Sequence, residues 1–262
     1  MNEMITSKDN ITIKLCRKLV ASAKERKEQG MFLAEGARLC CDAAKAGIRI
    51  TTLFATDEAQ KKYRQQLDII SEAAEKTWEI APSLAENLAD TKATQGVFCL
   101  CHIPAAIPFE PHQNGRYLLI DHLQDPGNLG TIIRGAEAFG ISGVVLSQGC
   151  PDLYSPKVLR STMGSAFRQP VYTVENLPDT ILKLQNQGVS TYAAALDHTA
   201  VTARQLSKEG GLAVVIGNEG NGVTDQVLKT CNAKVYIPMT SQIESLNAAA
   251  AATILMWEMS LA

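Results

Sequence analysis

The sequence lacks a long apolar run, so no membrane-spanning helix is expected. Its richest apolar stretch, from Ala248 to Met259, is too short to cross a bilayer. The stretch from Met1 to Lys14 shows neither the apolar core of a secretory signal nor the Arg- and Ser-rich pattern of a transit peptide. These absences argue against the membrane and secreted classes and predict a cytoplasmic protein.

Cysteine usage and charge argue against two further classes. The seven cysteines include no CxxC pair, which favours reduced thiols over a disulfide framework or a zinc site. Cys99, Cys101 and His102 are candidate metal ligands, but they lie in an alternating run that is more typical of a buried strand. We therefore expect no metal. The formal net charge is only −2, so no global field indicates a nucleic-acid partner.

The chain is long enough for one large domain or two modest ones. Its 262 residues are 46% hydrophobic and 20% charged, which is ordinary for a protein with a real core. Pro104, Pro108 and Pro111 fall in a stretch without clear periodicity. We therefore predict a linker at 104–114 between domains at 1–103 and 115–262.

Positive charge is concentrated near the start of the first domain. Residues 11–30 hold six basic and two acidic side chains, a local excess of +4. The pattern predicts one amphipathic helix from Ile11 to Gln29, with Ile11, Leu15 and Leu19 on its apolar face and Gly30 at its end. A solvated helix face is the plain interpretation of such a charge run. Short strands and helices alternate after it, so a small α/β domain is expected.

The second domain alternates apolar strands with helices. This alternation favours a mostly parallel sheet with helices on both faces. The expected strands are Arg116–Asp121, Val144–Leu146, Pro170–Val174, Thr191–Leu196, Leu212–Ile216 and Lys234–Ile237.

Three loops in this domain have the composition of a binding site. Gly217-Asn218-Glu219-Gly220-Asn221-Gly222 follows one apolar strand, Asp125-Pro126-Gly127-Asn128 another, and Ile237-Pro238-Met239 ends a third. Glycine lets backbone approach a ligand, and parallel sheets bind ligands at the carboxyl ends of their strands. A single glycine would indicate only a tight turn, but three such loops predict one shared pocket. The glycine loop reads GxxGxG, so it is not a dinucleotide fingerprint.

Several polar residues flank these loops. Arg134 lies about two turns into a helix predicted from Leu129 to Phe139, which Asn128 is placed to cap. Beside two alanines, this arginine indicates either a structural ion pair, with Glu137 or Glu219, or a cation that binds phosphate or stabilises an oxyanion. Helix capping is the plain interpretation of two residues at the start of the last helix, Ser245 and Asn247.

The three stretches resemble the three motifs of the SpoU (TrmH-type) branch of the SPOUT RNA methyltransferases. They read Asn128-x-Gly130-x-x-x-Arg134-x-Ala136, Gly217-Asn218-Glu219-Gly220-x-Gly222, and Ile237-Pro238-Met239 through Ser245-Leu246-Asn247. The segment from Tyr154 to Gly164 also matches the family. Phe32-Leu33-Ala34-Glu35-Gly36 resembles the ribosomal-protein-L30-like (L30e-like) substrate-binding domain often fused ahead of the catalytic one. The likeness covers nearly the whole chain from Lys14.

The resemblance implies a fold, a cofactor and a reaction. The implied catalytic domain is α/β, with a deep trefoil knot that holds S-adenosylmethionine, in a homodimer whose site borrows from the second subunit. The implied reaction methylates a ribose 2'-hydroxyl in ribosomal or transfer RNA, and the N-terminal domain favours ribosomal RNA. The cofactor contacts carried over are Gly217, Asn218, Ile237, Met239, Leu246 and Leu196. The catalytic residues carried over are Arg134, with Asn128, Glu219, Ser245 and Asn247 to orient it and the nucleotide.

Phosphate contacts and two competing functions complete the interpretation. One alternative is an RNA-binding module of the same fold that no longer transfers methyl groups, and the retained Arg134, Glu219 and Asn247 speak against it. The other is an enzyme of another class that binds a nucleotide in the pocket, and the absence of a GxGxxG motif argues against it. Base methylation and the identity of the target nucleotide stay open. The expected RNA contacts are Lys14, Arg17, Lys18, Arg26, Lys157 and Arg160.

Overall fold

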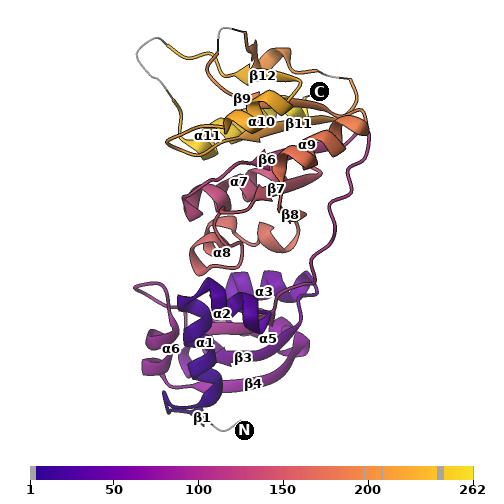
Figure 1. The fold of residues 1–262 in the computed structure, drawn as a ribbon. Coiled ribbons are helices and arrows are strands. Elements are labelled where there is room, and N and C mark those ends of the chain that lie inside the picture. The colour runs from indigo at the N-terminus through magenta and orange to yellow at the C-terminus, as the bar shows by residue number, and fades with distance from the viewer. Residues whose placement is uncertain (1–3, 198, 208, 241–244, 262) are drawn as a thin grey trace. The chain divides into compact units, whose positions relative to one another are not determined.

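The computed structural model describes residues 4–197, 199–207, 209–240 and 245–261. The chain divides into two compact units (Figure 1). The first unit runs to Ala105 and includes Asp152–Arg168, and the second contains Ala106–Pro151 and continues from Gln169. The division at Ala105 and Ala106 falls inside the predicted linker, whereas the sequence analysis places residues 152–168 in the second domain.

The first unit is a five-stranded mixed sheet in the order β1-β4-β3-β5-β2. β4 pairs in parallel with β1 and β3, and β5 pairs antiparallel with β2 and β3. Its strands are β1 Met4–Ile5, β2 Met31–Glu35, β3 Ile50–Ala55, β4 Ala74–Ile80 and β5 Val97–His102. Its helices are α1 Ile11–Ala21, α2 Ala23–Gln29, α3 Ala37–Lys45, α4 Asp57–Lys62, α5 Arg64–Ala73, α6 Pro82–Leu88, α8 Pro156–Thr162 and the 3₁₀ turn η1 Ser165–Phe167.

Both faces of this sheet are buried. Neighbouring residues of one strand enter opposite cores, as Leu53 and Phe54 do, because side chains alternate along a strand. Cys99 and Cys101 are free thiols on β5, so the predicted strand is confirmed. Burial raises the pKa of both thiols well above its ordinary value, which keeps them protonated.

The single helix predicted from Ile11 to Gln29 is wrong in two respects. Ser22 has extended backbone angles and separates α1 from α2, and its side chain accepts a hydrogen bond from the N–H of Glu25. Serine favours such a cap over a helix interior because its hydroxyl satisfies a free N–H. Ile11 is exposed, and the buried face of α1 instead contains Ile13, Cys16 and Leu19.

The second unit is a seven-stranded parallel sheet, which confirms the predicted parallel arrangement and adds the short strand β10 to the six expected strands. The order is β10-β12-β9-β11-β6-β7-β8. Its strands are β6 Arg116–Ile120, β7 Gly143–Ser147, β8 Val171–Val174, β9 Ser190–Ala194, β10 Val201–Thr202, β11 Leu212–Ile216 and β12 Ala233–Tyr236. Its helices are α7 Pro126–Ala138, α9 Leu177–Asn186, α10 Asp225–Thr230, α11 Ala248–Ser260 and the 3₁₀ turn η2 Ala203–Gln205.

The strand order creates a switch point between β6 and β11. The chain moves one way through β6, β7 and β8, and then returns to build β9, β11 and β12 on the other side of β6. Right-handed crossovers in opposite directions put α7 on one face and α9 and α10 on the other. α11 packs on α7, whereas α9 and α10 bury Ala213 and Val215 of β11. Ligands of parallel sheets bind at such a switch point, outside the carboxyl ends of the strands.

Over the residues that the structure covers, no helix combines the length and the apolar character needed to span a bilayer.

Candidate active site

The glycine loop after β11 is a tight, hydrogen-bonded hairpin. Asn218 and Gly222 exchange backbone hydrogen bonds, each with an N···O distance of 2.9 Å. The Asn218 side chain accepts from the N–H of Gly220 at 2.9 Å and donates to the carbonyl of His122 at 2.8 Å. A Cβ on Gly217 would overlap the backbone of Gly222, so this position needs glycine. The Asn218 side chain is therefore occupied in shaping the loop.

Glu219 joins the three predicted motifs into one network. Its carboxylate accepts from the backbone N–H groups of Gln124 at 2.9 Å and Asp125 at 3.0 Å. It also accepts from the Asn128 side-chain amide at 2.9 Å, and the Asn128 oxygen accepts from the Asn247 amide at 2.9 Å. The sequence analysis expected the motifs to converge, and these contacts bring them together.

The same contacts fix the charge of Glu219. Burial opposes its ionisation, but the hydrogen bonds from Asn128, Asp125 and Gln124 outweigh burial and hold its pKa below its ordinary value. A carboxylate with a lowered pKa stabilises the fold above the unfolded-state pKa, and this contribution is lost as the pH falls through the folded-state pKa. Glu219 is therefore ionised at neutral pH and acts as a hydrogen-bond acceptor.

Two local expectations about this region are wrong. Asn128 does not cap its helix, because α7 begins at Pro126 and Asp125 accepts from the Asn128 N–H at 2.8 Å as the N-cap. Glu219 is not the partner of Arg134, since its carboxylate is bound to the loop and to Asn128. The expected capping by Asn247 is confirmed, because its side-chain oxygen accepts from the N–H groups of Ala249 and Ala250.

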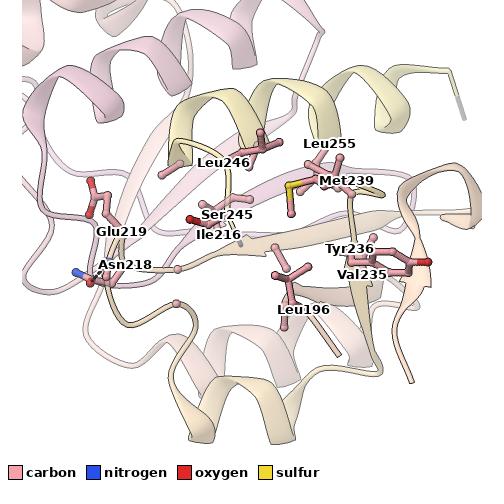
Figure 2. Close-up of a pocket in the computed structure, with 18 residues that line it drawn as sticks. Leu196, Ile216, Asn218, Glu219, Val235, Tyr236, Met239, Ser245, Leu246 and Leu255 are labelled. Carbon is pink, nitrogen blue, oxygen red and sulfur yellow. Dashed lines mark hydrogen bonds between the residues drawn. The ribbon is translucent and has the colours of Figure 1, made fainter. Parts of the chain in front are cut away.

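A pocket of about 400 Å³ lies beside this network, at the carboxyl ends of β9, β11 and β12. Figure 2 shows Leu246, Leu255 and Met239 on its α11 side, Leu196 opposite, and Glu219 with Asn218 at one end. All six predicted cofactor contacts line it: Gly217, Asn218, Ile237, Met239, Leu246 and Leu196. Two predicted catalytic residues, Glu219 and Ser245, also line it. Residues 241–244 of the third motif lie outside the described chain.

The sequence analysis missed part of this lining. Ala248, Ala251 and Leu255 reach the pocket from α11, and their spacing of three and four residues is the signal of one helix face. Asp121 was expected only as the last residue of a strand. Asp121 is 1% exposed, and one of its oxygens accepts from both the N–H and the hydroxyl of Thr224 at 2.8 Å.

Arg134 is an exposed side chain on α7. It is not among the described residues that line the pocket of its own chain. Within the described part of the chain, no hydrogen bond or ion pair of its guanidinium group is found. None of the described residues therefore holds this cation in an ion pair.

Arg26 must be removed from the predicted RNA contacts. Its side chain is buried, its Nε donates to Asp152 at 2.6 Å, and its Nη1 donates to the carbonyls of Leu19 and Val20. The buried guanidinium group thus holds the first unit together. The pattern of basic residues did not reveal this because Asp152 lies 126 positions further along the chain.

The other basic candidates are more accessible. Lys14 and Lys18 are exposed and form surface ion pairs with Asp9 at 2.9 Å and Glu25 at 3.9 Å. Such exposed ion pairs contribute little to the stability of the fold, so both lysines can exchange partners. Arg17 and Lys157 are also exposed, and Arg160 is partly exposed and pairs with an aspartate of the same unit, Asp90, at 2.6 Å.

The Glu219 network predicts a strong effect of Glu219→Gln. Glutamine has one acceptor oxygen and would turn its NH₂ group toward N–H donors, so the network loses at least one hydrogen bond. We expect kcat to fall roughly 10- to 100-fold, which corresponds to about 1.4–2.7 kcal/mol. Glu175→Gln is the matched control, because Glu175 is exposed in the same unit. Equal rates for the two variants would remove Glu219 from the catalytic network.

Comparisons with known protein families follow the two units. The model of the SpoU rRNA Methylase family matches residues 115–257, and the model of the MRM3-like substrate binding domain matches residues 10–99. The chain is 34% identical to the 23S rRNA (guanosine(2553)-2'-O)-methyltransferase RlmP of Bacillus subtilis over 98% of this chain and 99% of that protein. It is 31% identical to the mitochondrial rRNA methyltransferase 3 of Homo sapiens over 92% of this chain and 70% of that protein.

Solved structures of methyltransferases also match this chain over nearly its whole length. The AdoMet-bound rRNA methyltransferase from Sinorhizobium meliloti superposes with a TM-score of 0.86 at 30% identity, over 98% of this chain and 97% of that chain. The SpoU methyltransferase AviRb from Streptomyces viridochromogenes, solved in complex with AdoMet, superposes with a TM-score of 0.84 at 26% identity, over 96% and 98% of the two chains.

Proposed function

The chain belongs to the SpoU rRNA methylase family and is an S-adenosylmethionine-dependent RNA 2'-O-methyltransferase, and we propose that its substrate is ribosomal RNA. The observation that best supports a methyltransferase site is the Glu219–Asn128–Asn247 network beside a pocket lined by all the predicted cofactor contacts. The B. subtilis and human relatives are both named as rRNA methyltransferases, which favours ribosomal over transfer RNA.

The pocket residues fit S-adenosylmethionine. Its volume of about 400 Å³ lies in the range of small-molecule sites, and Leu196, Met239 and Leu246 offer apolar walls for an adenine ring. Gly217 lets the hairpin beside the pocket close, because a Cβ there would overlap the backbone of Gly222 and Val223. We propose that Gly217, Ile237 and Leu246 hold the cofactor through backbone groups, with Asn218 shaping the loop. When bound, the cofactor supplies an activated methyl group on a sulfonium.

The protein residues then have to align the hydroxyl and favour loss of its proton. Glu219, Asn128 and Asn247 form a fixed hydrogen-bonded frame, and we assign to them and to Ser245 the orientation of the target nucleotide. Arg134 would stabilise the negative charge that develops on the ribose oxygen, or hold the adjacent phosphate. No metal ion is needed in this scheme.

RNA contacts outside the pocket come from the first unit. Its residues 10–99 match a substrate-binding domain, and five of the six predicted basic contacts stay in the proposal after Arg26 is removed. They are Lys14, Arg17, Lys18, Lys157 and Arg160. Each cation that neutralises a phosphate releases a counterion, so binding through them should weaken as salt rises.

We further propose a homodimer with a trefoil knot at the cofactor site, working in the cytoplasm. The exposed Trp257 and Ile254 on α11 are apolar side chains that a second subunit would cover. Seven free cysteines suit a reducing compartment. We keep the domain boundaries of 1–103 and 115–262 as part of this proposal.

Methyl transfer from labelled S-adenosylmethionine to unmodified ribosomal RNA tests the function. The product is digested to nucleosides and identified by mass, with unmodified transfer RNA as the parallel substrate. We expect a 2'-O-methylated nucleoside from ribosomal RNA. A product from transfer RNA alone would move the substrate assignment, and a base-methylated product would overturn the chemistry assigned to Arg134. Cofactor binding without transfer to any RNA would favour the inactive RNA-binding module.

A further inference from the structure

His122 has an uncommon backbone conformation at the switch point of the sheet. Its φ is +55°, and among the described non-glycine residues only Met163 shares a positive φ. Histidine is tolerated in this region better than most residues, but the conformation still persists only when surrounding groups hold it. Residues held in this way gather at functional sites, so the surroundings of His122 are informative.

Four hydrogen bonds hold the backbone and ring of His122. Its N–H donates to the Ser147 hydroxyl at 2.9 Å, and its carbonyl accepts from the side chains of Asn218 at 2.8 Å and Gln124 at 3.2 Å. The ring Nδ1 lies 2.7 Å from a carboxylate oxygen of Asp121. The backbone of His122 is therefore held by β7 and the glycine loop, and its ring is oriented by Asp121, the residue directly after β6.

The carboxylate beside the ring, that of Asp121, has hydrogen-bond partners at both of its oxygens. Asp121 is buried, and its other oxygen already accepts two hydrogen bonds from Thr224. A buried carboxylate needs a hydrogen-bonding or cationic partner, and the imidazole of His122 occupies that position beside Asp121. Because Nδ1 faces Asp121, Nε2 is the ring nitrogen left for an outside partner, and the side chain is 55% exposed.

The groups around His122 are otherwise neutral or acidic. Asp121 faces the ring, a Cβ added to Gly149 would lie 3.4 Å from the ring Cδ2, and Glu219 directly follows Asn218 in the glycine loop. Burial raises the pKa of the nearby Cys150 thiol, which therefore stays neutral. A phosphate that approached this edge would meet negative carboxylates unless the imidazole were charged.

We propose that protonated His122 donates through Nε2 to a phosphate of the RNA next to the target nucleotide. This inference rests on the proposed function and adds an RNA contact to the same site. The phosphate completes a chain of carboxylate, imidazolium and phosphate in which each hydrogen bond is charge-assisted. His122 is thus a substrate-binding residue in the catalytic unit, separate from the basic residues of the first unit.

His122→Asn and His122→Gly test this contact, because both replacements accept a positive φ and neither carries an imidazole. We expect RNA affinity at low salt to fall about tenfold, the loss of one charge-assisted hydrogen bond. The slope of log affinity against log salt should fall by about 0.7–0.9. The loss should appear in RNA affinity, whereas cofactor affinity should stay at the wild-type level. His112→Asn removes another exposed imidazole of the same unit and is the control.

The pH dependence separates this role from a structural one. Wild-type RNA affinity should rise relative to His122→Asn as the pH is lowered, because a ring whose Nδ1 donates to Asp121 can donate from Nε2 only in its protonated form. Unchanged affinity and salt slope in both variants would overturn the proposal. An opposite pH trend would mean that Nε2 accepts from a ribose hydroxyl, which also overturns it. Failure of the wild-type enzyme to methylate RNA would instead count against the proposed function.

Discussion

Arg134→Ala should bind S-adenosylmethionine normally and lose methyl transfer. Removal of one preorganised cation or donor at a developing oxyanion lowers kcat roughly 100- to 1,000-fold. The side chain is exposed on α7 and lies outside the cofactor pocket of its own chain, so the fold and the pocket have little reason to change. The loss should therefore appear in kcat and not in thermal stability or cofactor affinity.

Two variants make this result specific. Arg134→Lys keeps the charge but not the planar, two-pronged donor set, so partial activity is expected. Arg204→Ala removes another exposed arginine of the same unit and should match the wild type. Kinetics at saturating RNA and cofactor give kcat, and isothermal titration gives the affinity for the cofactor. An Arg134→Ala enzyme that kept a third or more of the wild-type kcat would exclude the catalytic role.

The features that sequence predicted here are local or repeated. The parallel sheet followed from alternating strands and helices, and the pocket followed from three glycine- and asparagine-containing loops after strands. All six predicted cofactor contacts line one pocket because the carboxyl ends of parallel strands share one edge. The capping role of Asn247 needed only the residues two and three positions further along the chain, Ala249 and Ala250.

The features that sequence did not predict depend on distant partners. Arg26 reads as a surface cation until Asp152 is placed beside it. Glu219 reads as a partner for Arg134 until the N–H groups of Gln124 and Asp125 are found to bind its carboxylate. Asn128 reads as a cap because it precedes an apolar run, but Asp125 followed by proline starts the helix one turn earlier.

Gly217→Ala should weaken cofactor binding strongly. Its Cβ would overlap the backbone of Gly222 and Val223, which cannot rotate away as a side chain can. Overpacking of this kind costs about 1–3 kcal/mol, which is roughly a 10- to 100-fold loss of affinity if the displaced loop no longer fits the cofactor. The overlap lies in the hairpin that presents Asn218 and Glu219, so transfer should fall further than binding.

Gly220→Ala is the matched control for this loop. A Cβ at Gly220 would lie 3.6 Å from the nearest atom, the side-chain oxygen of Asn218, which is ordinary contact distance. Its cofactor affinity should stay within about threefold of the wild type, a change below 1 kcal/mol. Titration calorimetry compares the cofactor affinities of the two variants, and thermal melts monitor their folding. Equal affinities would show that the loop relaxes around the added methyl group and that Gly217 is not required by sterics.

The Arg134 and Gly217 variants together test whether each site uses two subunits. If Arg134 serves the pocket of the partner, a mixed dimer of Arg134→Ala and Gly217→Ala subunits contains one complete site: an intact pocket on the first and an intact arginine on the second. Random mixing of subunits in a two-fold dimer should then restore about a quarter of the wild-type activity, although each variant alone is inactive. If Arg134 serves its own chain, both sites of the mixed dimer lack a component and no activity returns. The absence of Arg134 from the pocket lining of its own chain favours restoration.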